Sequence, residues 1–300
     1  MRIGTLLRGS RIEEIIDCAE SARAIGYSSA WITDGIGMDP LTTLAVVGRA
    51  VPGIELATGV VRILPRHPMA LAQQALTVNA MTGGRLLLGI GPSHSRSMEQ
   101  GWGLSFARPV ATMQDYLSVL GPLLRDRQVA YTGDIYSAQG EFRIDSPRQV
   151  PVLIGGLGPR MLELAGRMAD GTVTFMTGPR TLIEFTCPTI RSAAAQVGRA
   201  SPRVVALVAV CVSDDKEAAA QRALEVAGPM VNLPFYAAAL EREGGPALLS
   251  GTEAEIRTEL TRLEEAGVTD FVPTRIARRD SVEAERTEAF LEELAASIRA

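Results

Sequence analysis

The stretch LTVNAMTGGRLLLGIG, residues 76–91, decides the fold because it joins the end of a helix directly to a buried strand. The glycine pair Gly83 and Gly84 allows the tight turn between the two elements. The unbroken apolar run at residues 86–88 is typical of a strand that is covered on both faces of a parallel sheet. The stretch therefore predicts an α/β fold with a parallel sheet in its interior.

Glycines also end this strand, and they indicate a ligand site. Gly89 and Gly91 would let a ligand approach the backbone closely at the carboxyl end of the strand, which is where α/β folds place their sites. The polar residues 92–96 follow and include Ser93 and His94. We expect them to form a site loop.

On both sides of residues 76–91 in the sequence, short apolar strands alternate with amphipathic helices. Strands are expected at residues 3–7, 28–33, 54–61, 86–91, 152–154, 171–176, 204–212 and 270–275. Eight strands with no shift of composition favour a single domain, residues 1–300, folded as an α/β (β/α)8 barrel of the TIM type rather than an open doubly wound sheet. Small insertions are expected after strands four and seven, as a hairpin within residues 128–150 and an excursion at residues 228–250.

Local signals predict where several helices begin and end. Capping boxes are expected at Ser10 with Glu13, at Asp214 with Glu217 and at Thr252 with Glu255. A long polar loop is expected at residues 93–108, and the last helix at residues 282–298.

Composition excludes several classes of protein. A net charge of −4 without a basic stretch argues against nucleic acid as a partner. No window approaches the ~20 apolar residues that a membrane span requires, and no leader pattern opens the chain, so we expect a cytoplasmic protein. Three separated cysteines and two unrelated histidines build neither a disulfide framework nor a metal site.

The strongest local signal is IGGLGPRM, residues 154–161, which lies between a strand and a helix. Gly156 and Gly158 permit a tight turn, Pro159 suits the first helical position, and free N–H groups at a helix start favour a phosphate. The dinucleotide fingerprint G-x-G-x-x-G fails because its third glycine is Met161. A glycine-rich turn without a ligand is the alternative.

Single polar residues near the expected barrel mouth allow two interpretations each. Asp34, at the end of strand two, is either an acid/base or cofactor-contacting group or a solvated turn residue. His94 is either a site residue or an ordinary loop histidine. Arg62, Arg66 and Arg96 either pair with an anionic ligand or are solvated at the surface.

Taken together, these residues resemble the luciferase-like monooxygenase superfamily, and within it the branch that uses the deazaflavin coenzyme F420. The resemblance is carried by four stretches, AIGYSSAWITD (24–34), DPLTTLAVVGRA (39–50), LATGVVRILPRHPMALAQQALTVNAMTGGRLLLGIGPSH (56–94) and PVLIGGLGPRMLELAGRMADG (151–171). It covers most of the first 175 residues and weakens afterwards. Such proteins are TIM-type barrels, often homodimers, with the flavin or deazaflavin across the carboxyl ends of the strands.

The resemblance assigns roles to particular residues. It implies a non-prolyl cis peptide at Gly59–Val60, a phosphate held by residues 156–158, and Asp34 facing the ring. The expected catalytic residues are Asp34 and His94. The expected cofactor-binding residues are Gly59, Val60, Arg62, Gly91, Ser93, Gly155, Gly156, Leu157, Gly158 and Pro159. Many relatives have histidine after the aspartate, where this chain has Gly35, and this leaves the proton donor unassigned.

Three hypotheses about function follow. The first is an F420-dependent oxidoreductase that transfers hydride between the deazaflavin and a small organic substrate, with a secondary-metabolite intermediate as one candidate. The second is a monooxygenase that uses reduced FMN, and the third is an inactive barrel that binds a ligand, which the loss of histidine at Gly35 keeps open. F420 carries an acidic tail that FMN lacks, so cations at the mouth would favour F420. The sequence does not name the substrate.

Overall fold

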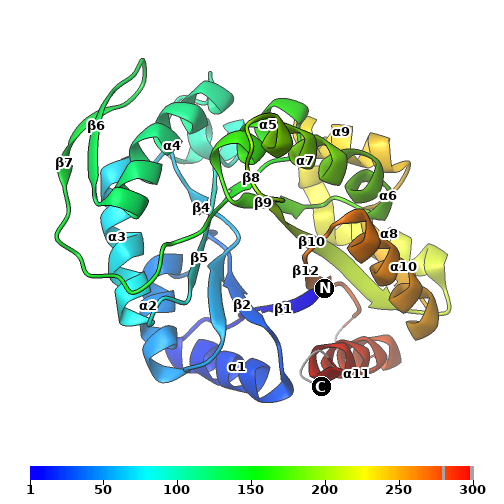
Figure 1. Ribbon diagram of the computed structural model, residues 1–300. Coiled ribbons are helices and arrows are strands. Elements are labelled where there is room, and N and C mark those ends of the chain that lie inside the picture. The colour runs from blue at the N-terminus through cyan, green and yellow to red at the C-terminus, as the bar shows by residue number, and fades with distance from the viewer. Residues whose placement is uncertain (279–280, 298–300) are drawn as a thin grey trace.

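The computed structural model describes residues 1–278 and 281–297, and its centre is a closed parallel barrel (Figure 1). The 8 barrel strands are β1 (Arg2–Leu6), β2 (Ser29–Ile32), β3 (Glu55–Thr58), β5 (Leu86–Gly91), β8 (Val152–Gly155), β9 (Gly171–Phe175), β10 (Arg203–Val212) and β12 (Asp270–Arg275). They pair in the order β10, β12, β1, β2, β3, β5, β8, β9, and β9 pairs with β10. The TIM-type (β/α)8 barrel is confirmed, with every predicted strand in its predicted place.

Helices surround the barrel (Figure 1). The helices between and after the barrel strands are α1 (Ile12–Ile25), α2 (Pro40–Ala50), α3 (Pro68–Met81), α4 (Pro109–Asp126), α5 (Pro159–Met168), α6 (Pro179–Thr181), the π-helix η2 (Leu182–Thr186), α7 (Cys187–Gln196), α10 (Glu253–Ala266) and α11 (Val282–Ser297). Residue Ile298, the predicted end of the last helix, lies outside the described residues. No helix in the described part of the chain is long and apolar enough to cross a membrane.

Both predicted insertions are present, and the second is more regular than expected. After α4 the chain forms an antiparallel hairpin of β6 (Gln128–Thr132) and β7 (Ser137–Glu141). After β10 it forms α8 (Lys216–Ala227), the 3₁₀ turn η3 (Gly228–Asn232), α9 (Pro234–Glu243) and β11 (Leu248–Gly251). The strand β11 pairs in parallel with residues 209–212 of β10.

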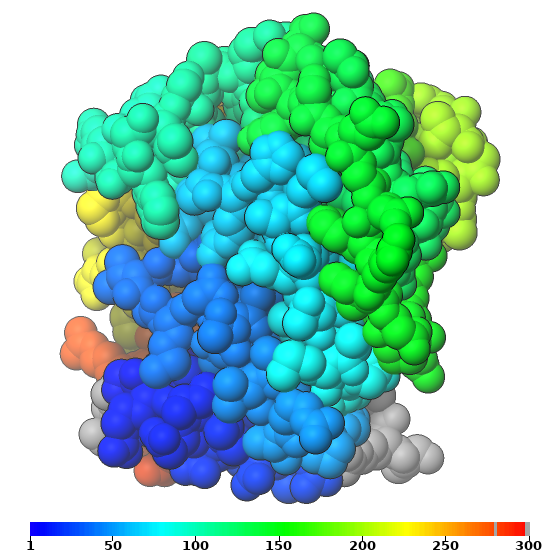
Figure 2. Space-filling view, turned by 90° about the vertical axis from the view of Figure 1, so that its left-hand side faces the viewer, coloured from blue at the N-terminus to red at the C-terminus, as the bar shows by residue number. Residues whose placement is uncertain are grey.

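The segment that returns from the hairpin lies over α3. In Figure 2 this segment, in green, runs down across the cyan helix. The buried Asn79 of α3 fastens it, because its amide Nδ2 donates to Ser146 Oγ and to the carbonyl of Arg148, each at 2.7 Å. The same side chain accepts from the backbone N–H of Leu86 at 3.1 Å and so ties the hairpin segment to the start of β5.

Several boundaries differ from the predictions. The third predicted strand is interrupted at the cis peptide bond between Gly59 and Val60. It ends at Thr58, and the short strand β4 (Val61–Arg62) follows the interruption. The long loop contains the π-helix η1 (Arg96–Gly101).

Two of the three capping boxes were wrong by one residue. At α1 the carboxylate of Glu14, not Glu13, accepts from the backbone N–H groups of Ser10 and Arg11. At α8 the cap is Asp215 rather than Asp214, since its side chain accepts from the N–H of Ala218. In both cases adjacent polar residues offer competing caps, and the start of the apolar stripe selects between them. The box of Thr252 with Glu255 is confirmed.

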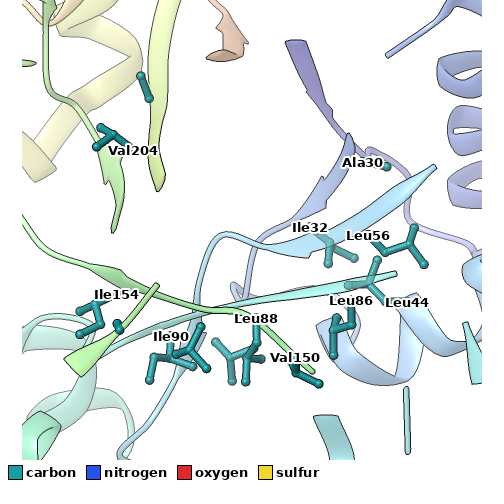
Figure 3. Close-up of a cluster of buried hydrophobic side chains, with 14 of the residues drawn as sticks. Ala30, Ile32, Leu44, Leu56, Leu86, Leu88, Ile90, Val150, Ile154 and Val204 are labelled. Atoms are coloured by element: carbon teal, nitrogen blue, oxygen red, sulfur yellow. The ribbon is translucent and has the colours of Figure 1, made fainter. Parts of the chain in front are cut away.

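The strands bury both faces, as the apolar run of β5 predicts. Outward side chains such as Ile32, Leu56 and Leu88 join the helices in the large core between barrel and helix layer (Figure 3). Inward side chains of alternate positions, including Trp31 and Leu87, form a second core inside the barrel. This separation follows from the two-residue period of a strand.

Trp31 fills much of the barrel interior and is fully buried there. Its indole Nε1 donates to Ser29 Oγ at 2.8 Å, so its polar atom has a partner. Gly4 on the neighbouring β1 makes room, because a Cβ at this position would lie 2.8 Å from Nε1.

Paired charged side chains fill the amino-terminal end of the barrel. The guanidinium of Arg203 on β10 donates to Asp270 Oδ2 of β12 at 2.8 Å and to Glu55 Oε2 of β3 at 2.7 Å. Strands β10 and β3 stand on opposite sides of the barrel, so this pairing spans its floor. Burial alone would lower the pKa of Arg203, but the two carboxylates raise it, and the side chain stays charged.

We predict that Arg203→Met lowers the free energy of unfolding by about 3–5 kcal/mol, because it leaves the fully buried carboxylate of Asp270 without its main partner. Urea unfolding at pH 7 measures the change. The matched control is Arg125→Met, whose ion pair with Asp126 is about half exposed and should contribute no more than ~1 kcal/mol. Equal losses of unfolding free energy in the two variants would contradict a special stabilising role for the ion pairs of Arg203 at the amino-terminal end of the barrel.

Candidate active site

A cavity of about 500 Å³ opens at the carboxyl ends of β2, β3, β5, β8 and β9. It is lined by all of the residues that the sequence predicts for the site, namely Asp34, Gly59, Val60, Arg62, Gly91, Ser93, His94, Gly155, Gly156, Leu157, Gly158 and Pro159. The barrel brings them together because each follows the carboxyl end of a strand, and these ends meet at one face. Their chemical roles stay predictions.

One wall of the cavity is backbone rather than side chain. The peptide bond between Gly59 and Val60 is cis, as the resemblance implies. The side chain of Val60 packs against the ends of two neighbouring strands, since a Cβ at Gly91 would lie 2.6 Å from Val60 Cγ2 and a Cβ at Gly155 would lie 3.3 Å from it. Glycine at these positions therefore makes room for the side chain of Val60 at the cavity wall.

The same wall ends at the start of α5. Gly158 is the residue before the helix, no side chain caps it, and Pro159 has no N–H to satisfy. The N–H groups of Arg160 and Met161 therefore face the cavity end as donors for an anion. A Cβ at Gly158 would meet no atom within 4 Å, so the space beside this backbone is open.

Asp34, after the end of β2, also lines the cavity, and its carboxylate is fully engaged. It accepts from the backbone N–H of Arg62 at 3.0 Å, from Arg62 Nη2 at 2.6 Å and from Arg66 Nη1 at 2.9 Å. Burial raises the pKa of Asp34, but these donors and the two positive charges outweigh it and lower the pKa below its usual value. A carboxylate held in this way is a poor proton donor at neutral pH.

Arg62 and Arg66 are therefore not the free cations that we expected for an acidic cofactor tail. Arg66 also pairs with Asp39 at 2.6 Å, so two arginines and two aspartates form one neutral cluster. The guanidinium of Arg62 lies 5.0 Å from the ring centre of Trp102, which covers it. Sequence reasoning missed this because about thirty residues separate the aspartates from the arginines.

Two arginines near the site are exposed, and nothing in the described part of the chain pairs with them. Arg96 lies in η1, beside His94, and Arg160 lies at the start of α5 and lines the cavity. Arg160 was not predicted. Its position after a strand, two glycines and a proline could have indicated it.

His94 borders two spaces. It lines the cavity, and it also lines an outer hollow that η1 and η3 form with residues such as Arg96, Gln100 and Met230. Its Nδ1 accepts from the backbone N–H of Ser97 at 3.3 Å, and this leaves Nε2 to contact a ligand. Partial burial, and the charge of Arg96 after it, lower the pKa of the imidazole below its usual value. His94 is thus mainly neutral at pH 7.

The remaining wall is aromatic and aliphatic, and the sequence did not reveal it. Phe106 comes from the long loop, Phe175 from β9, and Phe235 and Tyr236 from α9 in the second insertion. The rings of Phe106 and Phe235 stand 6.2 Å apart, and those of Phe175 and Tyr236 stand 6.0 Å apart at 82°. No periodic pattern marks these residues, so only the folded chain shows that they share a cavity.

The fold and this cavity define an α/β barrel with an open cavity at the carboxyl ends of its strands. The sequence settles the family, because the family model described as luciferase-like monooxygenase matches residues 2–299. The chain belongs to this family.

Individual relatives are more distant. The chain is 29% identical over 233 residues to a 5,10-methylenetetrahydromethanopterin reductase of Methanolobus tindarius, across 77% of this chain and 71% of that protein. It is also 29% identical over 219 residues to an F420-dependent glucose-6-phosphate dehydrogenase of Nakamurella multipartita, across 68% of this chain and 64% of that protein. The match to the second relative thus spans less than two thirds of its length.

Solved structures agree on the fold. An F420-dependent secondary alcohol dehydrogenase in complex with an F420-acetone adduct superposes with a TM-score of 0.80 at 19% identity and covers 98% of both chains. The monooxygenase RslO1 from Streptomyces bottropensis superposes with a TM-score of 0.75 at 16% identity and covers both chains fully. At these identities the likeness concerns the barrel alone.

We predict that Asp34→Asn lowers the free energy of unfolding at pH 7 by about 1–3 kcal/mol, because two partly buried guanidinium groups lose their carboxylate. Since the folded-state pKa of Asp34 is lowered, its contribution is fully present above pH ~4 and is lost as the pH falls through the folded-state value. The difference between wild type and variant, measured by urea unfolding, should be constant from pH 7 to 5 and shrink below pH 4. Asp126→Asn, on an exposed pair, serves as the control. If the two free energies of unfolding are equal at pH 7, or if they still differ at the lowest pH, the ion pairs of Asp34 do not stabilise the fold in this way.

Proposed function

We propose that this chain is an F420-dependent oxidoreductase that transfers hydride between the deazaflavin and a small organic substrate. The observation that carries the proposal is the glycine-lined wall that leads to the uncapped start of α5, in a chain whose family includes F420-dependent relatives. The substrates in the names of these relatives differ from one another, so none is transferred to this chain.

The residues present fit the cofactor. Val60, with Gly91 and Gly155 behind it, would support the ring, and the backbone of residues 156–158 with the N–H groups of α5 would hold the phosphate. Arg160 would meet the acidic tail, since Arg62 and Arg66 are already neutralised. When bound, the deazaflavin supplies the hydride donor or acceptor. The protein orients the two reactants and keeps water away from them.

His94 is the proposed proton-exchanging group. Gly35 offers no side chain, and the carboxylate of Asp34 is engaged by arginines. His94 Nε2 remains available in the cavity, while the outer hollow on its other side gives a route for exchange with solvent. An imidazole can donate a proton in its charged form during substrate reduction and accept one in its neutral form during oxidation.

The FMN-dependent monooxygenase is the second candidate, because the barrel of a solved monooxygenase is nearly as similar as that of the F420-dependent dehydrogenase. An FMN phosphate would use the same start of α5. The exposed Arg160 favours F420, since only F420 carries an acidic tail for it to meet. A homodimer, a cytoplasmic location and the single-domain organisation stay predictions from the sequence.

The deciding experiment measures cofactor binding. Purified protein is titrated separately with F420 and with FMN, and bound ligand is followed by its absorbance. We expect tighter binding of F420, with a preference that weakens as salt screens the contact of Arg160 with the tail. Equal or tighter binding of FMN with oxygen-dependent turnover would favour the monooxygenase, and binding of neither would contradict both candidates.

We predict that Gly158→Val reduces F420 affinity at least tenfold without loss of thermal stability. The backbone at Gly158 is extended, with φ −92° and ψ 157°, so valine is allowed there, and its side chain would enter open space where the phosphate must approach. The control is Gly121→Val, at a position in α4 that also has open space but lies outside the cavity. Unchanged F420 affinity in a folded Gly158→Val variant would refute the phosphate site.

We predict that His94→Gln slows turnover at least tenfold while F420 affinity changes little. Because the pKa of His94 is lowered, wild-type rates should change below pH ~6.5, with reduction becoming faster and oxidation slower as the pH falls. The rates of the His94→Gln variant should not show this dependence on pH. Rate profiles in both directions test the prediction, and a wild-type pH profile that survives in the variant would assign proton transfer elsewhere.

A further inference from the structure

Part of the cavity is lined by apolar side chains from separate elements. Val110 of α4 and Leu207 of β10 join the four aromatic residues of the loop, β9 and α9. Leu207 and Phe106 are buried, while Phe235 is 42% exposed and forms the rim. The two ring pairs, Phe106 with Phe235 and Phe175 with Tyr236, hold this wall together.

This part of the cavity carries no uncompensated charge. The charged residues that line the whole cavity, within the part of the chain described, are Asp34, Arg62 and Arg160. Asp34 and Arg62 belong to the neutral cluster, with side chains only 5% and 15% exposed. Arg160 lies at the start of α5, at the end assigned to the cofactor phosphate and tail. An anionic group seated against the apolar wall itself would therefore lose its hydration without a cation of that wall to pair with, since the exposed Arg160 lies at the start of α5 and Arg96 lines the outer hollow.

Two neutral hydrogen-bonding groups interrupt the apolar wall. Burial raises the pKa of the Tyr236 phenol, so its hydroxyl stays protonated, and His94 is mainly neutral. Each can donate to an oxygen acceptor or accept from a hydroxyl, and neither can neutralise a carboxylate or phosphate at pH 7.

From this arrangement we propose that the substrate is an uncharged, largely apolar molecule whose reacting group is a carbonyl or the corresponding alcohol, seated against Phe106, Phe235 and Leu207. The inference rests on the proposed function, because F420 at the glycine-lined wall leaves this part of the cavity for the substrate. With oxidised F420 bound as the hydride acceptor, the alcohol would give up the hydride of its C–H bond and its hydroxyl proton, and His94 would accept that proton. Reduction of the carbonyl by reduced F420 is the reverse.

A matched pair of probes tests the charge preference. 2-Acetylnaphthalene is a neutral aromatic ketone, and 2-naphthoate has nearly the same shape but carries a carboxylate. Binding of each is measured by calorimetry on protein with and without F420. We expect the ketone to bind at least tenfold more tightly than the carboxylate, and equal or tighter binding of 2-naphthoate would overturn the proposal.

Variants at Phe235 test whether the two probes bind beside this residue. Because Phe235 lies on the exposed rim of α9, Phe235→Lys introduces a cation without burying it, and Phe235→Met is the uncharged control of similar length. Phe235→Lys should raise 2-naphthoate affinity at least fivefold relative to the ketone, whereas Phe235→Met should keep the wild-type ratio. A ratio that is unchanged in Phe235→Lys would show that the probes bind elsewhere and would overturn the proposal.

The same titrations separate failure of this inference from failure of the proposed function. F420 binding is recorded from the absorbance of the cofactor in the same samples. If F420 does not bind while the ketone is preferred and the Phe235→Lys shift occurs, the proposed function fails and the apolar site stands. If F420 binds and the carboxylate is preferred, the substrate class is wrong and the cofactor assignment stands.

Discussion

The ion-pair network around Arg203 is the constraint on which the division of this barrel into two ends depends. Arg203, Glu55 and Asp270 come from strands β10, β3 and β12, and together they fill the amino-terminal floor with paired charge. Above this floor, Trp31 and its apolar neighbours fill the interior. The amino-terminal half of the barrel is thus filled, and the cavity of about 500 Å³ lies at the carboxyl ends of the strands.

Much of this arrangement could be predicted from local sequence. The strand ends at Asp34, Gly91 and Gly155 follow from short apolar runs that stop at a glycine or a polar residue, and eight such ends imply one shared face. Partners that depend on loop geometry could not be predicted. The ion pairs of Asp34 involve residues about thirty positions away, and Phe235 lies in an insertion whose apolar residues have no helical or strand period.

The site divides its tasks between backbone and side chains. The backbone, through the glycines and the start of α5, presents a glycine-lined wall and free N–H groups, which suit the constant parts of a cofactor. The side chains of Phe106, Tyr236 and His94 come from segments outside the barrel strands and line the cavity where the proposed substrate would lie. Asp34 fixes Arg62 and Arg66 at the cavity mouth, and a carboxylate engaged in this way suits a structural role better than proton exchange.

Strand β10 has two successive neighbours along one edge. Residues 203–207 pair with β9, and residues 209–212 pair with β11, which ends the second insertion. Residues 213–251 are thus anchored at both ends to a single strand, and they also contact neighbouring elements, since Tyr236 packs against Phe175 of β9 and Glu243 of α9 accepts from the N–H groups of Arg180 and Thr181. The insertion therefore takes part both in the cavity wall, through Phe235 and Tyr236, and in the packing of α6, through Glu243. A change of sequence in this segment would alter the shape of the cavity and the support of its surroundings together.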